Sequence, residues 1–120
     1  MSSKILIVDD SADAREMLAV LFGMEGYSVA TAEDGREGLM RASADSPDLI
    51  VTDIQMPNID GTEMIKRLRA EPTSSRVPII VMTAYGGDIA ARAVQSGADR
   101  ALSKPVDYDL LLETIKDLIN

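Results

Sequence analysis

The sequence predicts an α/β protein built on one parallel sheet. Short apolar runs alternate five times with capped segments of helical length, and runs of this kind are typical of strands that are buried on both faces. Repeated strand–helix units imply a parallel sheet with right-handed crossovers, so we expect five helices distributed over both faces of a doubly wound sheet. A further observation is that acidic, hydroxyl and amine side chains follow four of the five apolar runs.

Each predicted strand is an apolar run with turn-forming residues beside it. Pro47 precedes the third run and Pro57 follows it, whereas Pro78 lies near the start of the fourth run, where a missing backbone donor is tolerated. The predicted strands are Lys4–Val8, Tyr27–Thr31, Leu49–Asp53, Val77–Thr83 and Ala98–Ser103.

Capping residues mark the predicted helices. Ser11 and Asp107 can accept hydrogen bonds from first-turn N–H groups, and Gly26 and Gly97 are suited to the position after a last turn. The polar segment Glu71–Arg76 reads as a connector. The predicted helices run from Ser11 to about Met24, from about Asp34 to Ala44, from the Pro57–Gly61 loop to about Ala70, from about Asp88 to Ser96, and from Asp107 through about Ile119.

Composition narrows the class of protein. A chain of 120 residues that is 46% hydrophobic is expected to form one domain. A net charge of −8 argues against direct binding to nucleic acid or to an anionic membrane, and favours a partner with a basic patch. The absence of cysteine fits a reducing cytosol, the absence of histidine means that the chain cannot supply a phosphohistidine, and no stretch is apolar enough to span a bilayer. We therefore expect a cytoplasmic protein.

The strand ends predict a site for phosphoryl chemistry. Asp9, Asp10 and Asp53 would repel one another at one edge of the sheet unless a cation neutralised them, and an all-oxygen cluster selects Mg²⁺ or Mn²⁺. Lys104 is suited to pair with a phosphoryl oxygen, and the Thr83 hydroxyl can donate to another. Taken singly, the acids could be helix caps or a satisfied strand end, Thr83 a strand cap and Lys104 part of a surface turn. Their occurrence at successive strand ends favours the site.

These residues lie in segments that resemble a response-regulator receiver domain from Lys4 to about Ile119. The resemblance implies a flavodoxin-like sheet of strand order 2-1-3-4-5. The segments that carry it are Ile5-Leu6-Ile7-Val8-Asp9-Asp10, Asp53-Ile54-Gln55-Met56-Pro57-Asn58-Ile59-Asp60-Gly61, Val81-Met82-Thr83-Ala84 and Lys104-Pro105.

The resemblance also implies a metal site. Asp10, Asp53 and the backbone carbonyl of Gln55 would ligate Mg²⁺, and Asp9 would act mainly through a metal-bound water. Asp53 would accept a phosphoryl group from a phosphohistidine of a histidine kinase or a histidine phosphotransfer protein.

The remaining implied roles concern the bound phosphoryl group. Thr83 and Lys104 would bind its oxygens, and the Lys104–Pro105 bond would be cis. The phosphoryl group would shift the population of two states, and a downstream protein would bind the surface formed by the fourth helix, the fifth strand and the fifth helix. The domain would catalyse only its own phosphorylation and dephosphorylation and would not be an enzyme otherwise.

The sequence departs from the family pattern at Ala101, where an aromatic residue commonly lies three positions before the site lysine. An alanine cannot turn inward as that aromatic does. Tyr85 is the nearest alternative aromatic, and we hypothesise that Tyr85 and Gln55 flank the phosphoryl group and slow its hydrolysis. A tyrosine that merely packs on the surface is the other interpretation.

Residues 1–120 are expected to form a single receiver domain without an output domain in this chain. The last helix is expected to bury a stripe of four apolar residues and to lack a strongly basic face, which favours a monomer over a stable dimer and a stand-alone or relay role. The four residues are Leu110, Leu111, Ile115 and Leu118. A receiver cut from a larger regulator or hybrid kinase and a degenerate receiver that acts as an interaction module remain alternatives. An aspartyl-phosphate hydrolase would usually place an acid at Gln55, and a flavin carrier would not place acids after the first strand.

Overall fold

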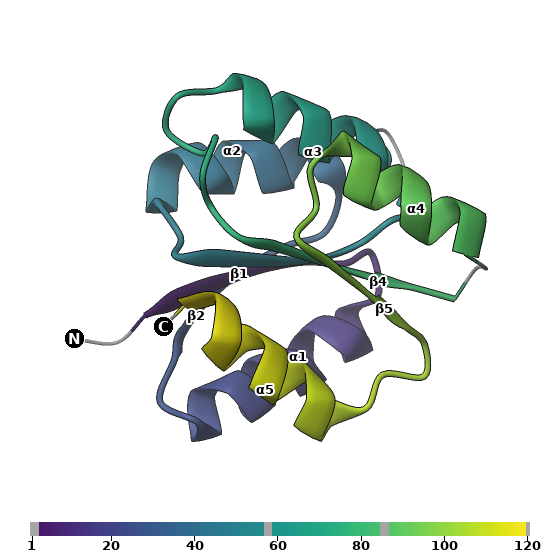
Figure 1. Ribbon diagram of the computed structural model, residues 1–120. Coiled ribbons are helices and arrows are strands. Elements are labelled where there is room, and N and C mark those ends of the chain that lie inside the picture. Colours follow the sequence, from purple (N-terminus) through teal and green to yellow (C-terminus); the bar gives the residue numbers. More distant parts are fainter. Residues whose placement is uncertain (1–2, 57–58, 85–86, 120) are drawn as a thin grey trace.

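The protein contains one parallel sheet between two layers of helices (Figure 1). The computed structural model describes residues 3–56, 59–84 and 87–119. Within them, five strands pair in the order β2-β1-β3-β4-β5, which confirms the predicted fold class and strand order. The strands are β1 (Lys4–Val8), β2 (Ser28–Ala32), β3 (Leu49–Asp53), β4 (Ile79–Thr83) and β5 (Arg100–Ser103).

The five helices cover both faces of the sheet, as predicted. In Figure 1, α2, α3 and α4 lie on one face, and α1 and α5 lie on the other. No helix in the described part of the chain is both long enough and apolar enough to cross a bilayer. The helices are α1 (Ala12–Met24), α2 (Gly35–Asp45), α3 (Gly61–Ala70), α4 (Gly87–Ser96) and α5 (Tyr108–Ile119).

Alternate residues of the central strands supply two hydrophobic cores. Ile5 and Ile7 of β1 face the cluster beneath α1 and α5, whereas Leu6 and Val8 face the cluster beneath α2, α3 and α4, and all four are fully buried. Both faces of β1 are therefore apolar, which is why its sequence shows no alternation of apolar and polar residues. Phe22 is the largest side chain of the α1–α5 core and is 0% exposed.

Three strands begin later than the sequence suggested. The Tyr27 N–H donates to the Phe22 carbonyl at the end of α1, so β2 begins at Ser28 and runs to Ala32, opposite Val8. The Ala98 N–H donates to the Ala93 carbonyl of α4, which delays β5 to Arg100. Because these N–H groups donate to carbonyls at the helix ends, they are not available for pairing with a neighbouring strand.

The start of β4 moves for a related reason. Val77 and Pro78 were predicted to belong to this strand, but it begins at Ile79. The Val77 N–H donates to the Ser74 carbonyl in the connector, and Pro78 has no N–H to contribute to the sheet. Pro78 therefore precedes the strand.

Carboxylate and hydroxyl caps fix the helix starts beside the sheet. Ser11 accepts a hydrogen bond from the Ala14 N–H at 3.3 Å, and Asp107 accepts one from the Leu110 N–H at 3.2 Å, as predicted. Asp34, predicted as the first residue of α2, lies one residue before the helix and caps it. Gly26 and Gly97 have φ angles of +91° and +126°, which favour glycine after a helix end.

The predicted apolar stripe of α5 is only partly correct. Leu111 and Ile115 are fully buried and Leu118 is half-buried, but 47% of Leu110 is exposed. Leu111 and Ile115, four residues apart, mark the buried face of α5, and Leu110 is turned about 100° from Leu111 toward solvent. Leu110 therefore belongs to the surface of α5.

Arg69 joins the end of α3 to the start of the last two strands. Its Nε and Nη2 donate to the Gly97 carbonyl at 3.0 and 2.9 Å, and its Nη1 donates to the Val77 carbonyl at 2.7 Å. Nη2 also donates to Asp99 Oδ2 at 3.0 Å, and the same oxygen accepts a hydrogen bond from the Ile79 N–H at 2.8 Å. One planar guanidinium thus holds the starts of β4 and β5 in place.

We expect Arg69→Lys to lower the free energy of unfolding by about 2 kcal/mol, because an ammonium cannot reach all of these acceptors and leaves buried carbonyls unpaired. Urea denaturation would measure the change. Arg67→Lys is the matched control, since Arg67 lies on the same helix in an exposed pair with Glu63, and it should cost less than about 0.5 kcal/mol. Equal losses in the two variants would contradict the role given to Arg69.

Candidate functional site

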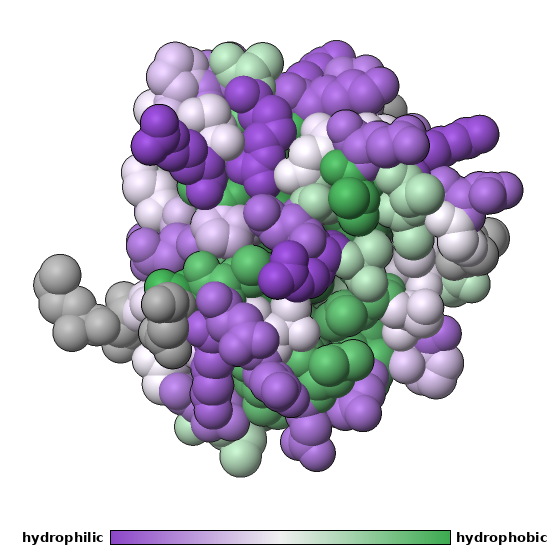
Figure 2. All heavy atoms as spheres, viewed as in Figure 1, coloured by the Kyte–Doolittle hydropathy of each residue, from purple (hydrophilic) through white to green (hydrophobic). Residues whose placement is uncertain are grey.

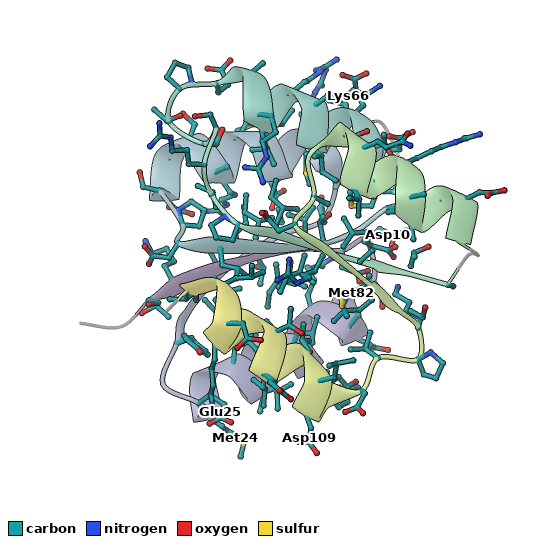
Figure 3. All side chains as sticks on the ribbon, in the orientation of Figure 1. Asp10, Met24, Glu25, Lys66, Met82 and Asp109 are labelled. Atoms are coloured by element: carbon teal, nitrogen blue, oxygen red, sulfur yellow. The ribbon has the colours of Figure 1, made fainter. Side chains whose placement is uncertain are left out.

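The predicted site residues lie at one edge of the sheet because the strands are parallel. Asp9 directly follows β1, Asp53 ends β3, and Thr83 ends β4. Thr83 pairs with Ser103 of β5, so Lys104 emerges beside it, and the Lys104 N–H donates to the Thr83 carbonyl at 2.8 Å. Asp10 lies at this same edge in Figure 3. Carboxyl ends of parallel strands are where α/β sheets bind their ligands.

Three carboxylates converge there. Oxygens of Asp9, Asp10 and Asp53 all lie within 4.8 Å of one another. Their exposure differs: Asp9 is 1% exposed, Asp10 is exposed, and the Asp53 side chain is 14% exposed. The charges of Asp9 and Asp53 therefore have little access to solvent, which weakens the screening of their mutual repulsion, whereas Asp10 is better screened.

The Asp9 carboxylate is only half satisfied by the protein. Its Oδ1 accepts a hydrogen bond from the Ser11 N–H at 2.9 Å, but Oδ2 is buried without a hydrogen-bond partner among the described residues. Burial raises the pKa of Asp9, and the charges of Asp53 and Asp10 raise it further, against the opposing effects of the Ser11 N–H and Lys104.

Lys104 provides the positive charge of the cluster. Its Nζ donates to Asp53 Oδ2 at 2.9 Å, while the Ile54 N–H donates to Asp53 Oδ1 at 2.7 Å. Partial burial alone would lower the pKa of Lys104, but the hydrogen bond to Asp53 and the charges of the neighbouring acids outweigh it and raise the pKa. Lys104 therefore offsets part of the negative charge of the three carboxylates.

The residues fit a hard divalent cation. An orphaned, buried carboxylate oxygen beside two further carboxylates offers the ligands that Mg²⁺ and Mn²⁺ prefer, and neither a histidine nor a cysteine is present in the chain. Gln55 lies two residues beyond β3 with an exposed side chain, next to a groove of about 350 Å³ between α3 and α4. Its predicted contribution is its backbone carbonyl.

The other predicted features of the site have different outcomes. Thr83 is 2% exposed at the end of β4, and the Lys104–Pro105 bond is cis, as the resemblance implied. Ala101 pairs with Val81 inside the sheet, so no aromatic side chain arises at this position of β5. Tyr85 lies outside the described residues, and its suggested role stays a prediction.

An apolar surface beside the cluster was not anticipated from the sequence. A pocket of about 360 Å³ extends from Asp9 and Lys104 to α1 and the start of α5, where the Tyr108 hydroxyl donates to Met17 Sδ at 2.6 Å. Figure 2 shows apolar atoms at the surface over these helices. On α1, Met17, Val20 and Met24 are 53%, 62% and 80% exposed, and Met24 marks the far end of the helix in Figure 3. Their spacing of three and four residues was the available signal.

Comparison with known proteins places the chain in a known family. The family model of the response regulator receiver domain matches residues 5–116. The chain is 39% identical to the response regulator MprA of Mycolicibacterium vanbaalenii, over 99% of this chain and 51% of that protein. It is 35% identical to the response regulator PleD of Caulobacter vibrioides, over 98% of this chain and 26% of that protein.

A solved structure agrees over the whole fold. The chemotaxis response regulator CheY4 of Vibrio cholerae superimposes with a TM-score of 0.92 at 33% identity, covering 98% of this chain and 99% of that chain. By contrast, the chain spans only about a quarter of PleD and about half of MprA.

We expect Asp9→Asn to stabilise the protein in EDTA by about 1 kcal/mol near pH 7, because it removes one of the crowded charges. The raised pKa of Asp9 means that its carboxyl group holds a proton more tightly in the folded state than in the unfolded state. The parent therefore loses stability as pH rises from the pKa of an unfolded aspartate through the raised native pKa, and the advantage of Asp9→Asn should grow over that range.

Urea denaturation at several pH values would measure this advantage. Asp10→Asn is the matched control, since the exposed Asp10 carboxylate should gain less from losing its charge. An Asp9→Asn variant no more stable than the parent in EDTA would show that Asp9 carries no repulsive cost.

Proposed function

This chain belongs to the response-regulator receiver family, and from this premise we propose that Asp53 accepts a phosphoryl group from a phosphohistidine of a histidine kinase or a histidine phosphotransfer protein. Receiver domains are signalling domains, so the product is a signal and not a released metabolite. The observation that carries the proposal is the pairing of Lys104 Nζ with Asp53 Oδ2 at 2.9 Å within the cluster of three acids.

Asp9, Asp10, Asp53 and the backbone carbonyl of Gln55 are the residues that would hold Mg²⁺, with Mn²⁺ as a substitute. The orphaned Asp9 Oδ2 and the concentration of charge support this assignment. A bound divalent cation supplies the positive charge that screens an approaching phosphoryl group from the carboxylates. Asp9 is the most buried of the three acids and would contribute mainly through a bound water.

The Asp53 carboxylate is the nucleophile. An Asp53 oxygen attacks phosphorus, the P–N bond of the phosphohistidine breaks, and the imidazole leaves with the electron pair. Lys104 transfers its hydrogen bond from Asp53 to a phosphoryl oxygen, and the Thr83 hydroxyl donates to another. Attack of water on phosphorus breaks the P–O bond to Asp53, releases inorganic phosphate and restores the carboxylate.

The phosphodonor protein would bind over α1 and the start of α5. The phosphohistidine must reach Asp53, so the donor has to cover the rim of the site, and the apolar pocket beside Asp9 and Lys104 continues from that rim onto Met17. The exposed apolar residues of α1 supply contact area, and the net charge of −8 favours a donor with a basic patch.

The output surface would be α4, β5 and α5, next to the loops that carry Thr83 and Lys104. Movement of these two residues toward a phosphoryl group shifts the end of β4 and the end of β5 together, because their backbones are hydrogen-bonded. A downstream protein, rather than nucleic acid, would bind this surface, because the chain carries a net charge of −8. We further propose that the domain is monomeric and cytoplasmic.

Incubation with acetyl phosphate and Mg²⁺ should add one phosphoryl group, because a small donor needs no protein partner. Intact-mass spectrometry would detect the gain, which should be absent in EDTA and in Asp53→Asn. Asp48→Asn, at the opposite end of β3, is the matched control and should be phosphorylated as the parent is. A gain of equal size in Asp53→Asn would reject Asp53 as the acceptor.

Val20→Lys should slow phosphoryl transfer from a phosphohistidine donor protein by about tenfold, because a charge interrupts the apolar contact. Its phosphorylation by acetyl phosphate should remain at the parental rate, since Val20 lies on the surface of α1 away from the acids. Met40→Lys, at an exposed position of α2, controls for an added surface lysine. Equal slowing with both donors would contradict docking on α1.

A further inference from the structure

The loop between β3 and α3 is closed at its end by Gly61. The Gly61 N–H donates to the Ile54 carbonyl at 2.6 Å. A Cβ at Gly61 would lie 2.6 Å from the Asp53 carbonyl oxygen and 2.7 Å from Ile54 Cα. Backbone therefore packs on backbone directly behind Asp53, and Gly61 is hydrogen-bonded to the carbonyl that precedes Gln55.

The far side of this loop rests against the first turn of α2. Gly35 is the buried first residue of α2, and a Cβ there would collide with the Ile59 carbonyl oxygen and lie 3.1 Å from both the carbonyl carbon and Cβ of Ile59. The carbonyl oxygen and carbon of Ile59 are main-chain atoms and its Cβ is fixed to the main chain, so none of them can move aside as the tip of a flexible side chain would. Even one methyl group would have to displace the loop or the helix.

The helix is the less movable of the two. Its first turn is capped by Asp34, whose Oδ1 accepts a hydrogen bond from the Glu37 N–H at 2.8 Å. One turn later, Gly38 packs so closely that a Cβ would lie 2.8 Å from Met64 Sδ and 3.2 Å from Val8 Cγ1. Since α2 is seated on β1 and α3, a methyl group at Gly35 would push on the loop.

We infer that Gly35 is a positioning residue for the metal site. The first turn of α2 limits how closely Ile59 can approach, and the missing side chain at Gly35 lets Ile59 come close enough for Gly61, two residues later, to bond the Ile54 carbonyl. Since Gln55 directly follows that carbonyl, this contact would position the Gln55 backbone. The inference rests on the proposed function for the identity of the ion, but the contact between Gly35 and Ile59 is a property of the metal-free protein.

The experiment compares Gly35→Ala with Gly87→Ala. Both glycines begin helices, but a Cβ at Gly87 has nothing within 4 Å among the described residues. In the metal-free protein, we expect the amides of Ile54 and Gly61 to exchange with solvent about tenfold faster in Gly35→Ala and at the parental rate in Gly87→Ala. Mg²⁺ titration followed by amide NMR shifts should show a dissociation constant about tenfold higher in Gly35→Ala only.

Two further variants separate positioning from general destabilisation. Phe22→Leu lowers stability from the core on the other face of the sheet and should leave the Mg²⁺ dissociation constant unchanged. Ile59→Ala keeps Gly35 and shortens the loop side chain that packs on the core, so it should weaken Mg²⁺ binding even if Gly35→Ala does not fold.

Parental exchange at Ile54 and Gly61 in Gly35→Ala, or parental Mg²⁺ affinity in Ile59→Ala, would overturn the inference. A parent protein that does not bind Mg²⁺ at all would instead overturn the proposed metal site, and the metal-free exchange rates would still decide whether Gly35 positions the loop.

Discussion

Repulsion among three carboxylates at one edge of the sheet is the constraint on which the rest of this structure depends. Asp9, Asp10 and Asp53 converge because β1 and β3 are parallel neighbours that end side by side, and Lys104, which directly follows β5, is placed to offset part of their charge. The domain therefore folds with an unfavourable concentration of negative charge that a bound divalent cation can relieve and that a phosphoryl group would increase, and such a site responds strongly to what binds it.

At the opposite edge of the sheet, where β4 and β5 begin, a cation is paired with several acceptors and no negative charge accumulates among the residues that it binds. Arg69 satisfies several carbonyls and the Asp99 carboxylate with a single guanidinium, and it fixes the starts of β4 and β5. Between the two edges, the central strands are buried on both faces. The starts of β4 and β5 are fixed by hydrogen bonds, whereas the carboxyl ends of the strands bear the repelling carboxylates. Motion on ligand binding is therefore expected at the carboxyl ends.

Sequence reasoning was most successful where a pattern is local. The bounds of β1 and β3 agree with the prediction because an apolar run ends abruptly at an aspartate in each case. The predicted start of β2 was wrong by one residue, because the Tyr27 N–H donates to the Phe22 carbonyl at the end of α1. Residue propensity does not reveal that hydrogen bond. The hydrogen bonds of Arg69 could not be predicted, since their acceptors are carbonyls brought together only by the fold. The exposure of Leu110 could not be predicted either, because it depends on the rotation of α5 about its own axis.

The proposed switch has to operate without an aromatic residue on β5. An inward-turning side chain would couple the two loops through packing, and Ala101 removes that route. The backbone offers another one: the Lys104 N–H donates to the Thr83 carbonyl, and Thr83 pairs with Ser103, so the two residues proposed to bind the phosphoryl group belong to one hydrogen-bonded unit. A displacement of Thr83 then carries Lys104 with it through the main chain. Coupling of this kind depends on strand pairing and not on the identity of residue 101, which makes alanine acceptable there.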